Sequence, residues 1–168
     1  MKHIIVPEEV REYGRAMSSH VDRKVLESLI QETENMDIIP ALGVALVRKL
    51  SEPTENEHYI TLLEGGYYNE GKAHLQGLKS AMAYYVQAKL VKTNDNQITR
   101  FGVIQKDSEY GYRPSLAERT DQYNDLASIA DQYLRDALDY IACHSEHFPT
   151  MCKRGIRNNR TIYRIIGE

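Results

Sequence analysis

Two long stretches with helical periodicity constrain the fold of this chain more than any other feature. In residues 71–92, and again from 115 to about 145, apolar side chains recur three and four positions apart, as on the buried face of an α-helix. The second stretch opens with a capping-box pattern, Ser115 and Glu118, directly after Pro114. The residues assigned to the core are Leu75, Leu78, Met82, Tyr85 and Val86 in the first stretch, and Leu116, Tyr123, Leu126, Ala127, Ala130, Leu134, Ala137, Leu138 and Ile141 in the second.

Shorter helices are expected upstream of these two. Ser19 and Asp22 have the spacing of a capping box for a helix over about 20–36, and Pro40 suits the first turn of the next helix. A third short helix is expected in residues 58–66, where two glycines close it. The core residues expected in the first two of these helices are Val25, Leu26, Leu29, Ile30, Met36, Leu42, Leu46, Val47 and Leu50.

The predicted fold is all-α: a helical bundle of about four to five helices over residues 1–150, with a projecting β-like arm and an extended C-terminal tail. A chain of 168 residues is long enough to form one domain with a real core. The arm covers residues 94–114, which begin with turn-forming Asn and Asp residues and continue with Tyr and charged residues. The tail, residues 151–168, has no helical period. A catalytic lid, a nucleic-acid finger and a contact to another subunit are the roles considered for the arm.

Charge separates the tail from the rest of the chain. The whole chain has a net charge of −3, but the tail holds five cations and one carboxylate, which leaves −7 for residues 1–150. The body is expected to repel polyanions, while the tail is expected to bind phosphate or an acidic protein surface. Its aliphatic residues favour a protein, because apolar anchors flanked by charges are typical of interface cores. The residues assigned to this contact are Arg154, Arg157, Arg160, Ile162, Tyr163, Arg164 and Ile165.

One cluster has the composition of a metal site: Cys143, His144, His147 and Cys152. Cys143 and His144 are adjacent at a helix end, where neighbouring side chains point about 100° apart. A complete tetrahedral zinc set would also need Cys152 from the tail. A nucleophilic pair of Cys143 with a distant His lacks an orienting carboxylate and a glycine-rich turn for an oxyanion hole. No metal, cofactor or catalytic residue is therefore expected.

The acidic side of the last helix offers a second candidate for chemistry. Asp121 and Asp125 lie one turn apart, and paired carboxylates can hold a metal or share a proton. A solvated face is the more common role of such residues. The aspartates on this side are Asp121, Asp125, Asp131, Asp136 and Asp139. With no stronger signature in the chain, we expect that the protein is not an enzyme.

Other function classes are limited by composition. No window approaches the roughly 18 apolar residues that span a bilayer, and the first residues lack the apolar stretch of a secretory signal. Two cysteines do not make a disulfide framework, so a reducing compartment is expected.

Three segments, taken in order, resemble head-tail connector proteins of tailed bacteriophages, in particular the neck proteins of crAss-like and other Bacteroidetes phages. The first is ETENMDIIPALGVALVRKL, in which a helix ends at an Ile-Ile-Pro-Ala-Leu-Gly turn and the next helix starts on the proline. The second is GLKSAMAYYVQAKLVKTNDNQITRFGVIQKDSEYGYRP, an Ala/Tyr-rich helix followed by an Asn-rich turn and Thr-Arg-Phe-Gly-Val. The third is SIADQYLRDALDYI, which resembles the closing helix.

The resemblance implies a structural virion protein, an adaptor (neck) ring that docks on the portal protein. The ring is a homo-oligomer, a dodecamer in the family, which continues the channel for genomic DNA and offers a surface to further neck and tail ring proteins. The protein would be found at the head-tail interface of the virion, after assembly in the host cytoplasm, without a membrane. Family members use C-terminal extensions to engage the portal, so the tail residues named above are assigned to portal binding.

In such a ring the arm would meet the next subunit by pairing backbone and placing aromatic side chains in the contact. The residues assigned to this contact are Arg100, Phe101, Val103, Tyr110 and Tyr112. The alternative for the arm is a self-contained hairpin that lies on its own bundle.

Two other functions remain open. The first is a nucleic-acid-binding module that uses the basic tail, with arginines on phosphates and Tyr163 on a base. The second is a metal-dependent enzyme that uses Cys143, His147 and the aspartates of the last helix.

Overall fold

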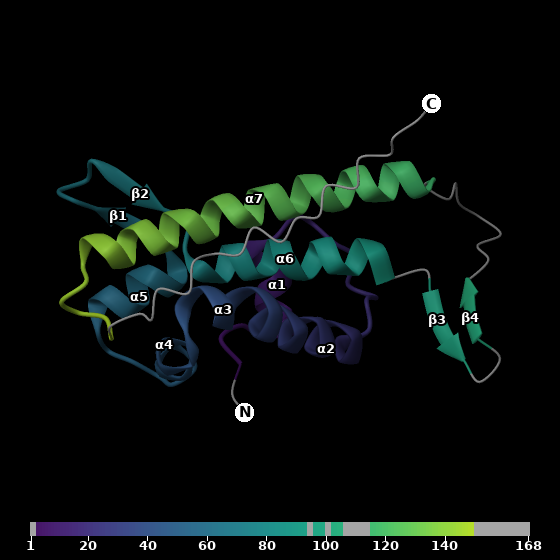
Figure 1. Ribbon diagram of the computed structural model, residues 1–168, viewed down its shortest axis with the longest axis horizontal. Coiled ribbons are helices and arrows are strands. Elements are labelled where there is room, and N and C mark those ends of the chain that lie inside the picture. The colour runs from purple at the N-terminus through teal and green to yellow at the C-terminus, as the bar shows by residue number, and fades with distance from the viewer. Residues whose placement is uncertain (1–2, 94–95, 100–101, 106–114, 150–168) are drawn as a thin grey trace.

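The protein is mostly helical (Figure 1). The structure, a computed structural model, describes residues 3–93, 96–99, 102–105 and 115–149. Its two longest helices, α6 (Leu78–Thr93) and α7 (Leu116–Cys143), lie antiparallel and side by side along the molecule. The predicted capping box of α7 is confirmed, because Ser115 Oγ accepts a hydrogen bond from the backbone N–H of Glu118 and the Glu118 carboxylate accepts one from Ser115 N–H.

α6 is the central helix of the body. It packs on α7 on one side and on α1 (Pro7–Tyr13), α2 (Arg23–Thr33) and α5 (Glu57–Glu64) on others. For this reason it is buried on nearly all faces, and the amphipathic pattern expected for it is wrong. Even the amide of Gln87 is buried, and it bonds the backbone N–H and C=O of Arg15 at 2.9 and 2.7 Å.

A short antiparallel hairpin replaces the expected first turns of this helix. β1 (Gly66–Tyr68) pairs with β2 (Ala73–Leu75), so Tyr67 lies opposite His74. Glycines with left-handed backbone close the base: Gly65 has φ +89° and Gly77 has φ +88°. A Cβ on Gly77 would lie 2.6 Å from the backbone of Glu64. The close packing of these two glycines therefore ends α5 and delays the start of α6 to Leu78.

The N-terminal half is divided into more helices than the sequence indicated. α2 starts at Arg23 with Asp22 as its cap, so the predicted capping role of Ser19 is wrong. α2 continues into a π-helical turn, η1 (Glu34–Ile38), and then into α3 (Ile39–Leu42). Gly43, at φ +82°, separates α3 from α4 (Val44–Leu50), because its left-handed backbone cannot continue a right-handed helix. The described residues thus hold seven α-helical segments and one π-helical turn, not four to five helices.

The core is one main cluster contributed by all the α-helical segments and by the N-terminal segment, with Ile5, Val10, Leu62 and Met82 among its fully buried members. Three residues assigned to the core are exposed instead. Two of them lie in the first turn of their helices. The third, Met36, lies in the π-helical turn, where the wider spacing moves its side chain away from the core. These residues are Val25, Met36 (67% exposed) and Leu116 (75% exposed).

The expected β-like arm is represented by a second hairpin. β3 (Asn96–Thr99) pairs antiparallel with β4 (Gly102–Gln105), with Ile98 opposite Val103. Figure 1 shows this hairpin beyond the end of α6, at the opposite end of the molecule from the β1–β2 hairpin. The tail lies outside the described residues, so a domain boundary at residue 150 stays a prediction.

Candidate functional site

The residues assigned to inter-subunit and portal contacts lie largely outside the described part of the chain. Val103 is in β4, where its backbone pairs with that of Ile98 in the same chain, and its assigned role in a contact with another subunit stays a prediction. The other assigned residues fall in segments that the structure does not describe. They are Arg100, Phe101, Tyr110 and Tyr112 in the arm, and Arg154, Arg157, Arg160, Ile162, Tyr163, Arg164 and Ile165 in the tail.

The β1–β2 hairpin is a second projecting element, and it was missed in the sequence. Tyr67 is 76% exposed and meets the ring of His74 edge-on, with 4.7 Å between the centroids. The tip takes left-handed backbone at Asn69, Glu70 and Gly71. Asn69 and Gly71 are residue types that favour turns, so they were the signal in the sequence for this tip. The exposed aromatic pair makes this hairpin a candidate contact surface.

A cluster of histidines forms where the C-terminal end of α7 meets α5. The ring of His58 stacks on His147 at 3.9 Å and lies 5.3 Å from His144, measured between centroids. His58 Nδ1 is also 3.2 Å from the hydroxyl of Tyr140, whose pKa is raised by burial. The sequence showed His144 and His147 together, but His58 joins them only through folding.

Two of the four residues considered for a zinc site, His144 and His147, belong to this cluster. Cys143 is exposed at the end of α7, and Cys152 lies outside the described residues. In the part of the chain that the structure describes, no group of three or more His, Cys, Asp and Glu side chains is arranged to hold a metal ion. The described geometry is one of aromatic packing, in which imidazole rings stack on each other and on tyrosine.

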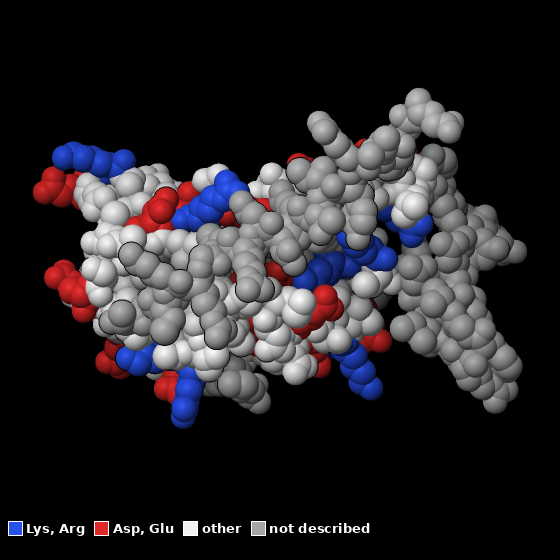
Figure 2. All heavy atoms as spheres, in the orientation of Figure 1, with Lys and Arg blue, Asp and Glu red and all other residues white. Residues whose placement is uncertain are grey.

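Three of the five aspartates of α7 have partners in the described part of the chain. The exposed Asp125 forms an ion pair with Arg15 at 2.7 Å, and Tyr85 donates its hydroxyl hydrogen to Asp131 Oδ1 at 2.6 Å. Asp136 accepts a hydrogen bond from Gln132. Figure 2 shows that acidic and basic side chains are interspersed on the visible face of the body. These contacts give the three aspartates a structural role, on the surface of α7 and between α7 and its neighbours.

Two ion pairs are partly buried between helices. Lys89 of α6 lies 3.0 Å from Asp37 and 3.4 Å from Glu32, which ties α6 to η1 and α2. Burial raises the pKa of Asp37 more than Lys89 lowers it. Burial by itself lowers the pKa of Lys89, but the hydrogen bond to Asp37 and the two carboxylate charges outweigh it, so the pKa is raised. The raised pKa values of Asp37 and Lys89 are those of a partly desolvated ion pair, and this pair joins α6 to η1.

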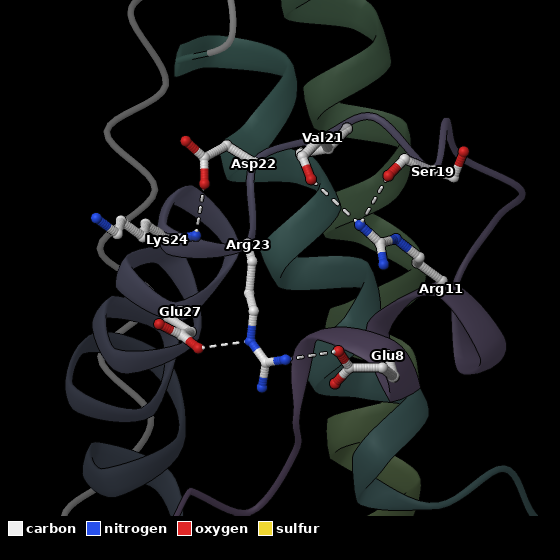
Figure 3. A network of polar contacts seen from close by, with 8 residues as sticks. All are labelled: Glu8, Arg11, Ser19, Val21, Asp22, Arg23, Lys24 and Glu27. Atoms are coloured by element: carbon white, nitrogen blue, oxygen red, sulfur yellow. Dashed lines mark hydrogen bonds and ion pairs between the residues drawn. The ribbon is translucent and has the colours of Figure 1, made fainter.

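A second polar network joins α1 and α2 (Figure 3). Arg23 lies between Glu8 at 3.2 Å and Glu27 at 2.9 Å. Arg11 donates to the carbonyl oxygens of Ser19 and Val21 and so holds the loop between the two helices. The network fixes α2 against the N-terminal part of the chain.

Comparisons with known proteins place the chain in a family. No curated protein and no solved structure matches it. Within the described residues, no helix is both long and apolar enough to cross a membrane. A family match covers residues 38–161, which is most of the chain and includes both long helices and the arm. The protein therefore belongs to DUF6712, a family of unknown function.

Proposed function

We propose that this protein is a head-tail adaptor of a tailed bacteriophage, a subunit of a ring that docks on the portal and recruits the next neck or tail protein. The proposal rests on the ordered resemblance of three segments to connector proteins. The structural observation that supports it most is the β3–β4 hairpin between α6 and α7, at the end of the body opposite the β1–β2 hairpin.

A ring needs a subunit with two different contact surfaces. Neighbours in a cyclic ring meet head to tail, so each subunit must present two different, complementary surfaces. A bundle of helices with an element projecting at either end has this layout, and an unpaired strand edge can bind a neighbour through its backbone. In this proposal the arm contacts the next subunit and the basic tail anchors the ring on the portal.

The proposed ring also needs a lumen that does not bind DNA. The body has an excess of seven negative charges, and Asp121 and Asp139 are exposed along α7. Carboxylates facing a channel would repel phosphates and let genomic DNA pass. We propose the virion, at the head-tail interface, as the location of the protein.

The proposal is tested by co-sedimentation with the purified portal ring, using the full chain and a chain that ends at residue 150. Binding of the full chain at a fixed subunit ratio, lost on truncation, is the expected result. Binding by both chains would retain the adaptor and remove the tail from portal anchoring.

No binding by either chain to an intact portal would contradict the adaptor. Salt-dependent DNA binding that disappears without residues 153–168 would then favour the nucleic-acid-binding module.

A further inference from the structure

An open groove of about 800 Å³ lies beside the N-terminal segment and has no part in the proposed ring contacts. Its walls are residues 3–7, one face of α2 and the loop after α4. Glu34 holds the first wall in place, because it accepts a hydrogen bond from Ile4 N–H at 2.8 Å and bonds His3 at 2.6 Å. The apolar lining is formed by Ile4, Ile5, Val6, Ile30, Leu50 and Leu63.

The charged lining of this groove has a small acidic excess, with Glu9, Glu27 and Glu52 against Arg23 and Lys79. Both cations are paired: Arg23 with Glu8 and Glu27 (Figure 3), and Lys79 with Glu9 and Glu64, while Glu52 pairs with Arg48 beside the groove. With these neighbouring partners counted, five carboxylates meet three cations. An occupant with positive charges and aliphatic side chains therefore fits the groove.

We propose that the groove is the docking site of residues 153–166 of the same chain. This segment carries five cations and no carboxylate, which complements the acidic excess of the groove. Its aliphatic and aromatic residues complement the lining, and they are Ile156, Ile162, Tyr163, Ile165 and Ile166. The segment thus supplies both chemistries that the groove requires.

The chain leaves the body close to the groove. Phe148, next to the last described residue, packs on the ring of Tyr59 at 5.1 Å between centroids. Tyr59 is one helical turn before Leu63, which lines the groove. Only residues 150–152 separate Pro149 from the docked segment, and this link spans at most about 14 Å, so the segment enters the groove at the wall formed by Leu63 of α5.

The tether favours the same chain over a second copy. A segment attached by a few residues is present at its docking site at an effective concentration in the millimolar range. The same segment of a second copy, at micromolar concentration, would occupy the groove far less often than the tethered segment. The inference concerns the isolated protein. Because the proposed function assigns the same tail to the portal, the segment would leave the groove when the ring forms.

Trypsin tests the docking, because the segment contains Lys153 and four arginines as cleavage sites. Ser28, an exposed residue that lines the groove, is changed to Trp to fill it. Ser128→Trp, at an exposed position of α7, is the matched control. Full-length variants of unchanged helical content are digested briefly, and release of the C-terminal peptides is followed by mass spectrometry.

We expect Ser28→Trp to speed the release of these peptides about tenfold over wild type, and Ser128→Trp to leave it unchanged, because docked segments are cleaved only when they open. Equal rates in wild type and Ser28→Trp would overturn the docking.

Protection that increases with protein concentration, together with a doubled mass in sedimentation, would overturn docking on the same chain in favour of a second copy. If the segment is protected in the isolated protein but the protein does not bind the portal, the adaptor proposal is contradicted and the docking proposal is retained. The two proposals therefore fail separately.

Discussion

At the residue scale, the buried amide of Gln87 is the clearest polar determinant of the fold. It satisfies both backbone groups of Arg15 after the end of α1, and its side chain lies where a Cβ on Gly14 would have to go. Replacing it with an apolar residue would leave two backbone groups without a partner. Buried polar groups left in this way cost about 1–3 kcal/mol each.

We therefore predict that Gln87→Leu lowers the free energy of unfolding by about 2–3 kcal/mol, because Arg15 loses both hydrogen bonds. Urea denaturation followed by circular dichroism measures the change. Gln122→Leu, on the exposed side of α7, is the control and is expected to change it by less than about 0.5 kcal/mol. Equal stability of Gln87→Leu and wild type would contradict the structural role of the amide.

The ion pair of Lys89 predicts a dependence on alkaline pH. The pKa of Lys89 is raised in the fold above its ordinary value of 10.5, so its stabilising contribution is complete below that pH and is lost as the pH rises through the folded pKa. The stability advantage of wild type over Lys89→Met should therefore stay constant from pH 8 to about pH 10 and shrink as the pH rises above 10.5. Lys24→Met, at an exposed lysine of α2, should show no such change. An advantage that is constant or grows with pH would contradict the pairing.

At the scale of elements, the β1–β2 hairpin depends on the glycines at its base. Gly77→Ala is predicted to lower the free energy of unfolding by about 2–4 kcal/mol, because its φ is +88° and the new Cβ meets backbone at 2.6 Å. Gly71 at the tip has φ +80° but open space around it in the described structure, so Gly71→Ala should cost only about 1 kcal/mol. Similar losses in urea denaturation for both variants would show that crowding at Gly77 is not decisive.

The elements that the sequence predicted correctly are those set by local signals. The capping box of Ser115 starts α7, and Gly65 ends α5, as their neighbours in the chain indicate. The start of α6 was not predictable in this way. It depends on backbone packing between Gly65 and Gly77, which are twelve residues apart. Burial of α6 on nearly every face likewise comes from the helices that surround it.

The candidate sites were predictable to a smaller extent. The β-pairing of the arm follows from its composition, and Val103 lies in the expected strand. The stacking of His58 on His147 joins residues that are far apart in the sequence, and no local pattern connects them. The groove likewise combines the N-terminal segment, α2 and the loop after α4, so only the folded chain shows it.

At the scale of the whole molecule, the two hairpins at opposite ends define the assembly that we propose. Arg100→Glu and Tyr112→Ala, each in the arm, are predicted to impair assembly on the portal, because the arm is the proposed contact to the next subunit. Both should leave the helical content of the monomer unchanged. Lys49→Glu, at an exposed position of α4 outside both hairpins, reverses a charge as Arg100→Glu does and serves as the surface control. Normal assembly of either arm variant would show that the arm is not a critical contact.

Electron microscopy of the portal ring mixed with the full-length protein is the most direct test of the adaptor. The account predicts an additional ring of density, coaxial with the portal and continuous with its channel, in particles that contain the protein. Portal particles that remain unchanged at saturating protein concentration would contradict it.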